Sequence, residues 1–134
     1  MRFLWGHLSP GVPRAAAKAA TTAASCAAVE WLTLTDEGKS KEGWHAASSL
    51  LQNAVPEEQF AQMLAGARKP LGKLVSRDLR LAHYAISLPG APDGQYVVIR
   101  YAASFENKKS AIETITPKLD TDGMARVWLL HQVS

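Results

Sequence analysis

A change of hydrophobic period near Pro70 constrains the fold of this chain more than any other feature of its sequence. Before Pro70, apolar residues recur every three or four positions, as they do on one face of an α-helix. After it they alternate, most clearly in residues 95–105, where every second side chain from Val97 to Phe105 is apolar. A helical half followed by a strand half predicts an α+β fold, with helices packed on one face of an antiparallel sheet.

Three helices are predicted in the first half. The longest covers about 14–37, because alanine, the best helix former, fills much of it and Gly38 follows where helices commonly end. We expect it to bury one stripe, at Ala16, Ala20, Ala23, Ala27, Trp31 and Leu34. A second, short helix starting near Ser40 would bury Trp44, Ala47, Leu51 and Ala54. A third starts at Pro56 and ends just before Pro70, because the residue before a proline disfavours helical backbone.

Four antiparallel strands are predicted in the second half, over about 71–88, 95–105, 109–119 and 124–133. In the first strand the apolar positions change from even to odd and back, which requires extra residues. We therefore expect β-bulges near Arg77 and near His83, and a bent strand. The segment PGAPDG would connect the first hairpin, and Asp120-Thr121-Asp122-Gly123 would turn the last one.

These elements predict one domain over 14–134, preceded by an irregular segment over 1–13 that contains two prolines and two glycines. The N-terminal helices would pack on a curved four-stranded antiparallel sheet, with the longest helix across its concave face. This is the architecture of cystatin-like and NTF2-like folds, whose sheets bend at bulges.

Composition excludes several partners. The net charge is only +3 over 134 residues and the basic residues are scattered, so we expect no nucleic-acid partner. No apolar run approaches the roughly 20 residues that a membrane span needs. The first residues begin like a signal peptide but lack its apolar core. The single cysteine, Cys26, allows no intramolecular disulfide, and we expect it to be a small buried residue on a helix.

Several motifs also resemble a known family. They are Trp31-Leu32-x-Leu34-x-Asp36-x-Gly38, Trp44-x-Ala46-Ala47, Arg68-x-Pro70-Leu71-Gly72, Ser76-Arg77, LPGAPDGxYVV over 88–98, and Glu113-Thr114. Together they resemble DUF4019, a family of uncharacterised bacterial proteins, over about 29–123. The resemblance implies a small protein of unknown function, usually exported or periplasmic, and it transfers no catalytic residues. The chain departs from the family pattern at Ser40, Gly43 and Ala125, and it shows no convincing signal peptide.

Sequence motifs give no catalytic residues, no cofactor and no metal site. Neither nucleotide-binding fingerprints nor nucleophile motifs occur. His83 and His131 lie in strands that could be neighbours, but a surface or hydrogen-bonded histidine is the favoured interpretation of each. Residues 120–123 begin like a calcium loop and lack its later ligands, so they are interpreted as a turn.

Arg68, Arg77 and Glu113 form the most informative polar set. Either arginine could pair with Glu113 or bind exposed carbonyl groups through its planar, multi-donor head, which is the structural role we favour. The alternative is an anion site for a small carboxylate or phosphate. With Trp31 and Tyr101 these residues make up the candidate pocket or anion site.

Two functions remain open. The first is a non-enzymatic binding or interaction module of the bacterial envelope, forming a homodimer through the outer face of its sheet, with a further protein or small-molecule partner unspecified. The second is a small-molecule pocket protein, or an NTF2-like enzyme that uses a buried carboxylate as a proton shuttle.

The second function would need a pocket between the long helix and the sheet. Its candidate inward-facing residues are Asp78, Tyr84, Tyr101 and Glu113. A volume of roughly 300 Å3 or more near Trp31, Tyr101 and Val127, with a carboxylate directed into it, would favour this function. An enzyme is disfavoured, because alanines bring the helix close to the sheet and leave little space.

Overall fold

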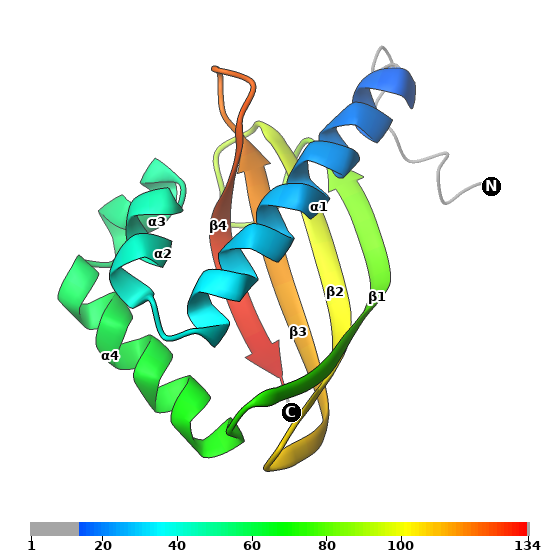
Figure 1. Cartoon of the computed structure of the whole chain (residues 1–134). Helices are drawn as coiled ribbons and strands as arrows, with labels where there is room; N and C mark the ends of the chain where they lie inside the picture. Colours follow the sequence, from blue (N-terminus) through cyan, green and yellow to red (C-terminus); the bar gives the residue numbers. More distant parts are fainter. Residues whose placement is uncertain (1–13, 134) are drawn as a thin grey trace.

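The helical half and the strand half occur in the order expected from the sequence. The computed structural model describes residues 14–133 (Figure 1). The helices are α1 (Arg14–Asp36), α2 (Ser40–Ala46), α3 (Ser49–Ala54) and α4 (Glu57–Arg68), followed by a 3-10 turn, η2 (Lys69–Leu71). The strands are β1 (Leu74–Ala85), β2 (Gln95–Phe105), β3 (Lys108–Leu119) and β4 (Ala125–Val133). This confirms the α+β class and is compatible with a cystatin-like or NTF2-like architecture. The prediction for 1–13 lies outside the described residues.

The long helix α1 has the expected bounds but buries a different face. Its buried residues are Ala17, Ala20, Ala24, Ala28, Trp31, Leu32 and Thr35. The predicted stripe is therefore wrong by about one residue along most of the helix, and Ala16 and Cys26 are exposed. Alanine occupies so many positions here that the sequence offers little contrast between one face and the next. Gly38 follows the helix with a φ of 75°, as expected for the residue that ends it.

The second predicted helix is in fact two. Ser48 separates α2 from α3, and its hydroxyl accepts a hydrogen bond from the backbone N–H of Leu50 at 3.0 Å, as an N-cap does. The backbone N–H of Ser48 donates to Val127 of β4 at 2.8 Å, which ties this corner to the edge of the sheet. Ala47 and Leu51 are buried as expected, whereas Ala54 is exposed.

The four strands form an antiparallel sheet in the order β1-β2-β3-β4. The register of β1 against β2 shifts between Leu74 and Ser76 and again between Leu79 and Leu81. The two expected irregularities are therefore present, each two or three residues before its predicted centre at Arg77 or His83. The parity of apolar residues displaced them because Leu81 is 43% exposed and pairs with Arg100 on the outer face, so it does not mark a buried position. Both expected hairpin connections are present, over 86–94 and 120–124.

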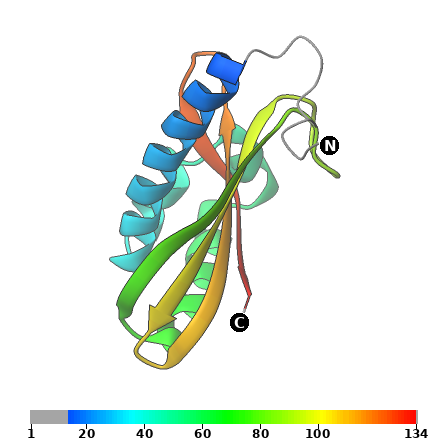
Figure 2. The same cartoon turned by 90° about the vertical axis from the view of Figure 1, so that its right-hand side faces the viewer.

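Only one face of the sheet is covered by α1. In Figure 2, α1 lies along one side of the strands, and no described helix lies across the other side. The helices α2, α3 and α4 lie beyond the β4 edge and continue around the end of α1 (Figure 1). The core fills the space between α1 and the sheet, and it includes Trp31, Leu32, Val97, Ile99 and Ile115.

Candidate functional site

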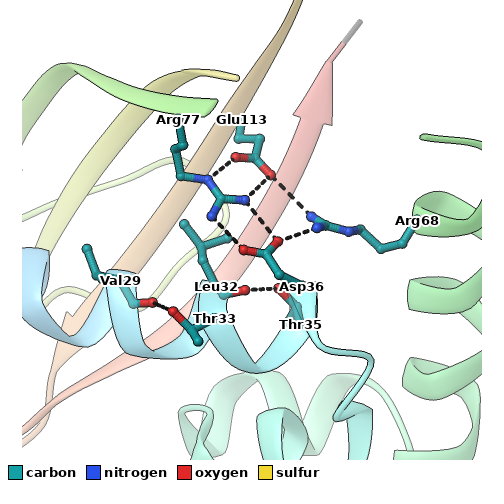
Figure 3. A network of polar contacts seen from close by, with 8 residues as sticks. All are labelled: Val29, Leu32, Thr33, Thr35, Asp36, Arg68, Arg77 and Glu113. Carbon is teal, nitrogen blue, oxygen red and sulfur yellow. Dashed lines mark hydrogen bonds and ion pairs between the residues drawn. The ribbon is translucent and has the colours of Figure 1, made fainter. Parts of the chain in front are cut away.

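Four charged residues from four separate elements meet where α1 ends. Asp36 is the last residue of α1, Arg68 the last of α4, Arg77 lies in β1 and Glu113 in β3 (Figure 3). We call these four residues the charge network. Because they lie far apart in the sequence, only the tertiary arrangement of α1, α4 and the sheet brings them together.

Arg77 is the centre of the charge network. Its Nε donates to Glu113 Oε1 at 2.6 Å and its Nη2 to Glu113 Oε2 at 3.1 Å. On its other side, Nη1 donates to Asp36 Oδ2 at 2.7 Å and Nη2 to Asp36 Oδ1 at 3.0 Å. The guanidinium of Arg77 thus binds each of the two carboxylates through two hydrogen bonds. This bidentate geometry makes arginine–carboxylate pairs strong and directional.

Arg68 closes the network from the side of α4. Its Nη2 donates to Asp36 Oδ1, and its Nη1 lies 3.4 Å from Glu113 Oε2. The guanidinium carbon also lies 4.9 Å from the centroid of the Phe105 ring, within the range of a cation–π contact. The end of α4 is therefore attached both to α1 and to the sheet.

The charge network is largely removed from solvent. The side chain of Glu113 is fully buried, while those of Arg68 and Arg77 are 11% and 13% exposed. Burial by itself disfavours the charged form of Arg77, but hydrogen bonds to Asp36 and Glu113 raise its pKa above the ordinary value. Two positive and two negative groups balance, so the favoured structural role for the arginines agrees with the geometry.

The five candidate site residues do not all share one place. Arg68, Arg77 and Glu113 meet in the charge network, and Tyr101 lies opposite Glu113 in the β2–β3 register. Burial raises the pKa of Tyr101, an effect that Arg77 partly opposes. Trp31 lies outside the charge network. Its indole N–H donates a hydrogen bond to the carbonyl of Gly43 at 2.7 Å, which joins α1 to α2.

Asp36 is the network member that the sequence did not mark as a candidate site residue. It was visible only as one letter of the motif that ends the first helix, and nothing in its neighbourhood pointed to Arg68 or Arg77. Asp78 was expected to face inward. It is exposed and pairs with Ala102 on the outer face of the sheet, one residue out of phase with the inward-facing Arg77.

Two grooves lie near these residues. The larger, of about 450 Å3, is bordered by the end of α1, by α4 and by the turn before β1. The smaller, of about 320 Å3, lies between α1 and the β3–β4 hairpin and is lined by Trp31, Val127 and the exposed Glu30. Tyr101 lines neither groove.

The described residues offer no metal cage, since no group of three or more metal-ligating side chains occurs among them. The strands that contain His83 and His131, β1 and β4, lie at opposite edges of the sheet rather than side by side. Among the described helices, none combines the length and apolar character that crossing a membrane requires.

Comparison with known families decides the relationship. The family model described as "Protein of unknown function (DUF4019)" matches residues 27–128. The chain belongs to the DUF4019 family. Neither the curated proteins nor the solved structures contain a significant match to it. All four members of the charge network lie within the part of this DUF4019 chain that the family model matches, and all four belong to the motifs that carried the resemblance.

Proposed function

We propose that this DUF4019 chain is a non-enzymatic interaction module of the bacterial envelope, and that it pairs with a second copy of itself through the outer face of its sheet. The outer face is the side opposite α1, and its central residues are Asp78, Leu81, Val98, Arg100, Ala102 and Ile112. The envelope location follows from the resemblance to largely exported proteins. The observation that carries the proposal is a filled interior beside a sheet face that no described helix covers.

The filled interior supports a module without catalytic activity. Trp31 is 2% exposed, and Leu32, Ile99 and Ile115 have no exposed surface, so the space between α1 and the sheet is occupied by side chains. Glu113, the buried carboxylate considered for proton transfer, accepts hydrogen bonds from Arg77 and lies beside Arg68. A proton shuttle needs a carboxylate that faces its substrate, and this one faces two guanidinium groups.

The outer face has a composition suited to pairing. Leu81 and Ile112 are 43% and 46% exposed and lie on different strands of this face. Asp78 pairs with Ala102 and Arg100 pairs with Leu81, so the two charges lie on adjacent strands. In a two-fold arrangement each Asp78 can meet the Arg100 of the other copy, which makes the face self-complementary.

The size of the face is also adequate. β2 has 11 residues, and the sheet has four strands. At about 3.3 Å per residue along a strand and about 4.8 Å between strands, a face of four strands of that length covers on the order of 700 Å2. A specific interface of standard size buries about 800 Å2 on each partner. A dimer through this face is therefore expected to be specific, with a moderate affinity because the charged Asp78 and Arg100 lie among its central apolar residues.

Light scattering coupled to size-exclusion chromatography tests the proposal. The unmodified protein should elute as a dimer at high concentration, and Ile112→Asp should shift it to the monomer. Met63→Asp is the matched control, because Met63 is 56% exposed on α4, away from this face, and the variant should remain dimeric. A strict monomer at every concentration, or an Ile112→Asp variant that dimerises as the control does, contradicts the proposal.

Charge exchange gives a second, independent test of the orientation. Asp78→Arg and Arg100→Asp should each weaken the dimer, because each places like charges across the two-fold axis. The double variant, which carries both changes, should recover dimerisation. If the double variant is weaker than both single variants, the two residues do not face each other in the dimer.

A second function, small-molecule binding, is favoured by one observation. The smaller groove has a volume of about 320 Å3 near Trp31 and Val127, which is within the range that a ligand pocket needs. Its carboxylate, from Glu30, lies on the exposed side of α1 rather than between the helix and the sheet. The observation therefore supports a surface ligand site and gives no separate support to an enzyme.

A further inference from the structure

We propose that the groove of about 450 Å3 at the end of α1 binds a small organic anion with an apolar body, such as a medium-chain carboxylate. This groove, which we call the α1–α4 groove, is separate from the outer face, and the proposal does not depend on dimerisation. In Figure 1 the end of α1, the end of α4 and the start of β1 lie around the same corner of the molecule.

Small residues keep the α1–α4 groove open above an apolar floor. Ala61, Leu64 and Ala65 recur at three- and four-residue steps of α4, so they line one side of that helix together. Leu64 is buried and forms the floor, while the two alanines leave space above it. Gly38 and Gly72, which also line the groove, contribute no side chain.

The walls of the α1–α4 groove are fixed before any ligand arrives. Asp36 and Arg68, which line it, are held in the charge network. Glu106 at its edge accepts a hydrogen bond from the backbone N–H of Lys73 at 2.8 Å. A Cβ at Gly72 would come within 2.9 Å of Glu106 Oε1, so the glycine allows this close approach. A preformed groove binds a ligand at a lower entropic cost than one that must be ordered.

The charge available to a ligand comes from two lysines rather than from the arginines. Arg68 already binds Asp36 and Glu113, and Glu106 is engaged with the backbone of Lys73. Lys69 and Lys73 both line the groove and are exposed, and neither has an ion pair within the described part of the chain. Their flexible ammonium groups can reach an anionic group that lies at the rim.

This pairing of charge and surface selects the class of ligand. A phosphate group is best recognised by free arginine forks, and the forks of Arg68 and Arg77 are occupied by carboxylates. Two lysine point charges beside an apolar floor instead suit one anionic head attached to a hydrocarbon body. We therefore expect the head of the ligand near Lys69 and Lys73 and its body along Leu64.

Octanoate is the probe for the test. Acetate is the control that has the carboxylate without the alkyl chain, and 1-octanol is the control that has the alkyl chain without the charge. Titration calorimetry and amide NMR shifts on the whole chain should show saturable octanoate binding at low millimolar concentration, with shifts centred on residues 61–73. Acetate should produce no saturable shift there, and 1-octanol should bind more weakly than octanoate. No saturable octanoate binding, or shifts centred on another region, overturns the proposal.

Paired variants locate the binding site. Lys69→Ser with Lys73→Ser should weaken octanoate binding about tenfold, because two exposed ion pairs are lost. The control, Lys41→Ser with Lys109→Ser, removes the same charge from exposed positions elsewhere and should bind normally. Ala65→Phe should abolish binding by filling the groove, with circular dichroism to confirm the fold. Equal affinities in the two lysine pairs overturn the proposal.

The monomeric variant separates this inference from the proposed dimer. Ile112→Asp should bind octanoate with the affinity of the unmodified protein, because Ile112 lies on the outer face and outside the groove. Loss of octanoate binding in Ile112→Asp would place the site at the dimer interface and refute the groove. Normal binding with no dimer in the unmodified protein would refute the dimer alone.

Discussion

Replacing Glu113 by glutamine tests whether the charge network holds the helices on the sheet. Glu113 is fully buried, and Arg77 donates to it at 2.6 and 3.1 Å. Glutamine keeps the shape of the side chain but removes its charge, and its amide directs N–H groups at arginine donors. The substitution leaves the guanidinium groups of Arg68 and Arg77 with Asp36 as their remaining carboxylate.

The expected cost follows from the burial of this pair. Removing one partner of a buried ion pair destabilises a protein by about 3–5 kcal/mol, because the other charge stays buried without compensation. Arg68 and Arg77 keep 11% and 13% of their side-chain exposure and also keep Asp36, so we expect the lower end, about 3 kcal/mol. With a urea dependence of about 2 kcal/mol/M, the unfolding midpoint should fall by about 1.5 M.

Equilibrium unfolding in urea, followed by tryptophan fluorescence and circular dichroism, measures this change. Glu30→Gln is the matched control, because Glu30 is exposed on α1, and it should stay within about 0.5 kcal/mol of the unmodified protein. Arg77→Gln combined with Glu113→Gln should cost less than the sum of the two single changes, since the residues are in contact. A Glu113→Gln variant as stable as the control, or additive costs, would refute the reasoning.

Two further predictions concern turns. Gly72 and Gly90 have φ values of 75° and 78°, but only a Cβ at Gly72 meets a neighbour, Glu106 Oε1 at 2.9 Å. In thermal or urea unfolding, Gly90→Ala should cost about 1 kcal/mol and Gly72→Ala at least about 1 kcal/mol more; the opposite ranking contradicts this. The hydrogen bond from Arg126, followed by one from a backbone N–H, lowers the pKa of Asp122 from 3.8 to about 2. Because this pKa is depressed, its small stabilisation is complete above pH 3.8 and is lost as the pH falls toward about 2. A 13C titration should show this midpoint and its rise in Arg126→Gln; a midpoint near 3.8 before the substitution contradicts the assignment.

The sheet could be predicted from the sequence because its signal is local. Alternation over 95–105 matches β2 residue for residue, and the turn at 120–123 connects β3 to β4. The buried face of α1 could not be predicted reliably, since alanine on several faces gives no hydrophobic contrast. Ser48 falls in the middle of the single helix predicted from about Ser40 to Ala54, although its side chain caps a second helix.

The candidate site was only partly predictable, for a related reason. Arg68, Arg77 and Glu113 stood out as charges within apolar patterns, and the structure brings them together. Asp36 stands at the end of an amphipathic helix, where a charged residue is ordinary and needs no buried partner. Its role depends on α4 reaching the end of α1, an arrangement that no short segment of the sequence encodes.

The charge network also has a consequence for the order of folding. Its bonds join residues that are between 32 and 45 positions apart, so several chain loops must close before the first of them can form. We therefore expect the strand hairpins, whose pairings are local, to form early and the network to form late, so that it slows unfolding of the native state. Substitutions in it should then accelerate unfolding far more than they retard folding.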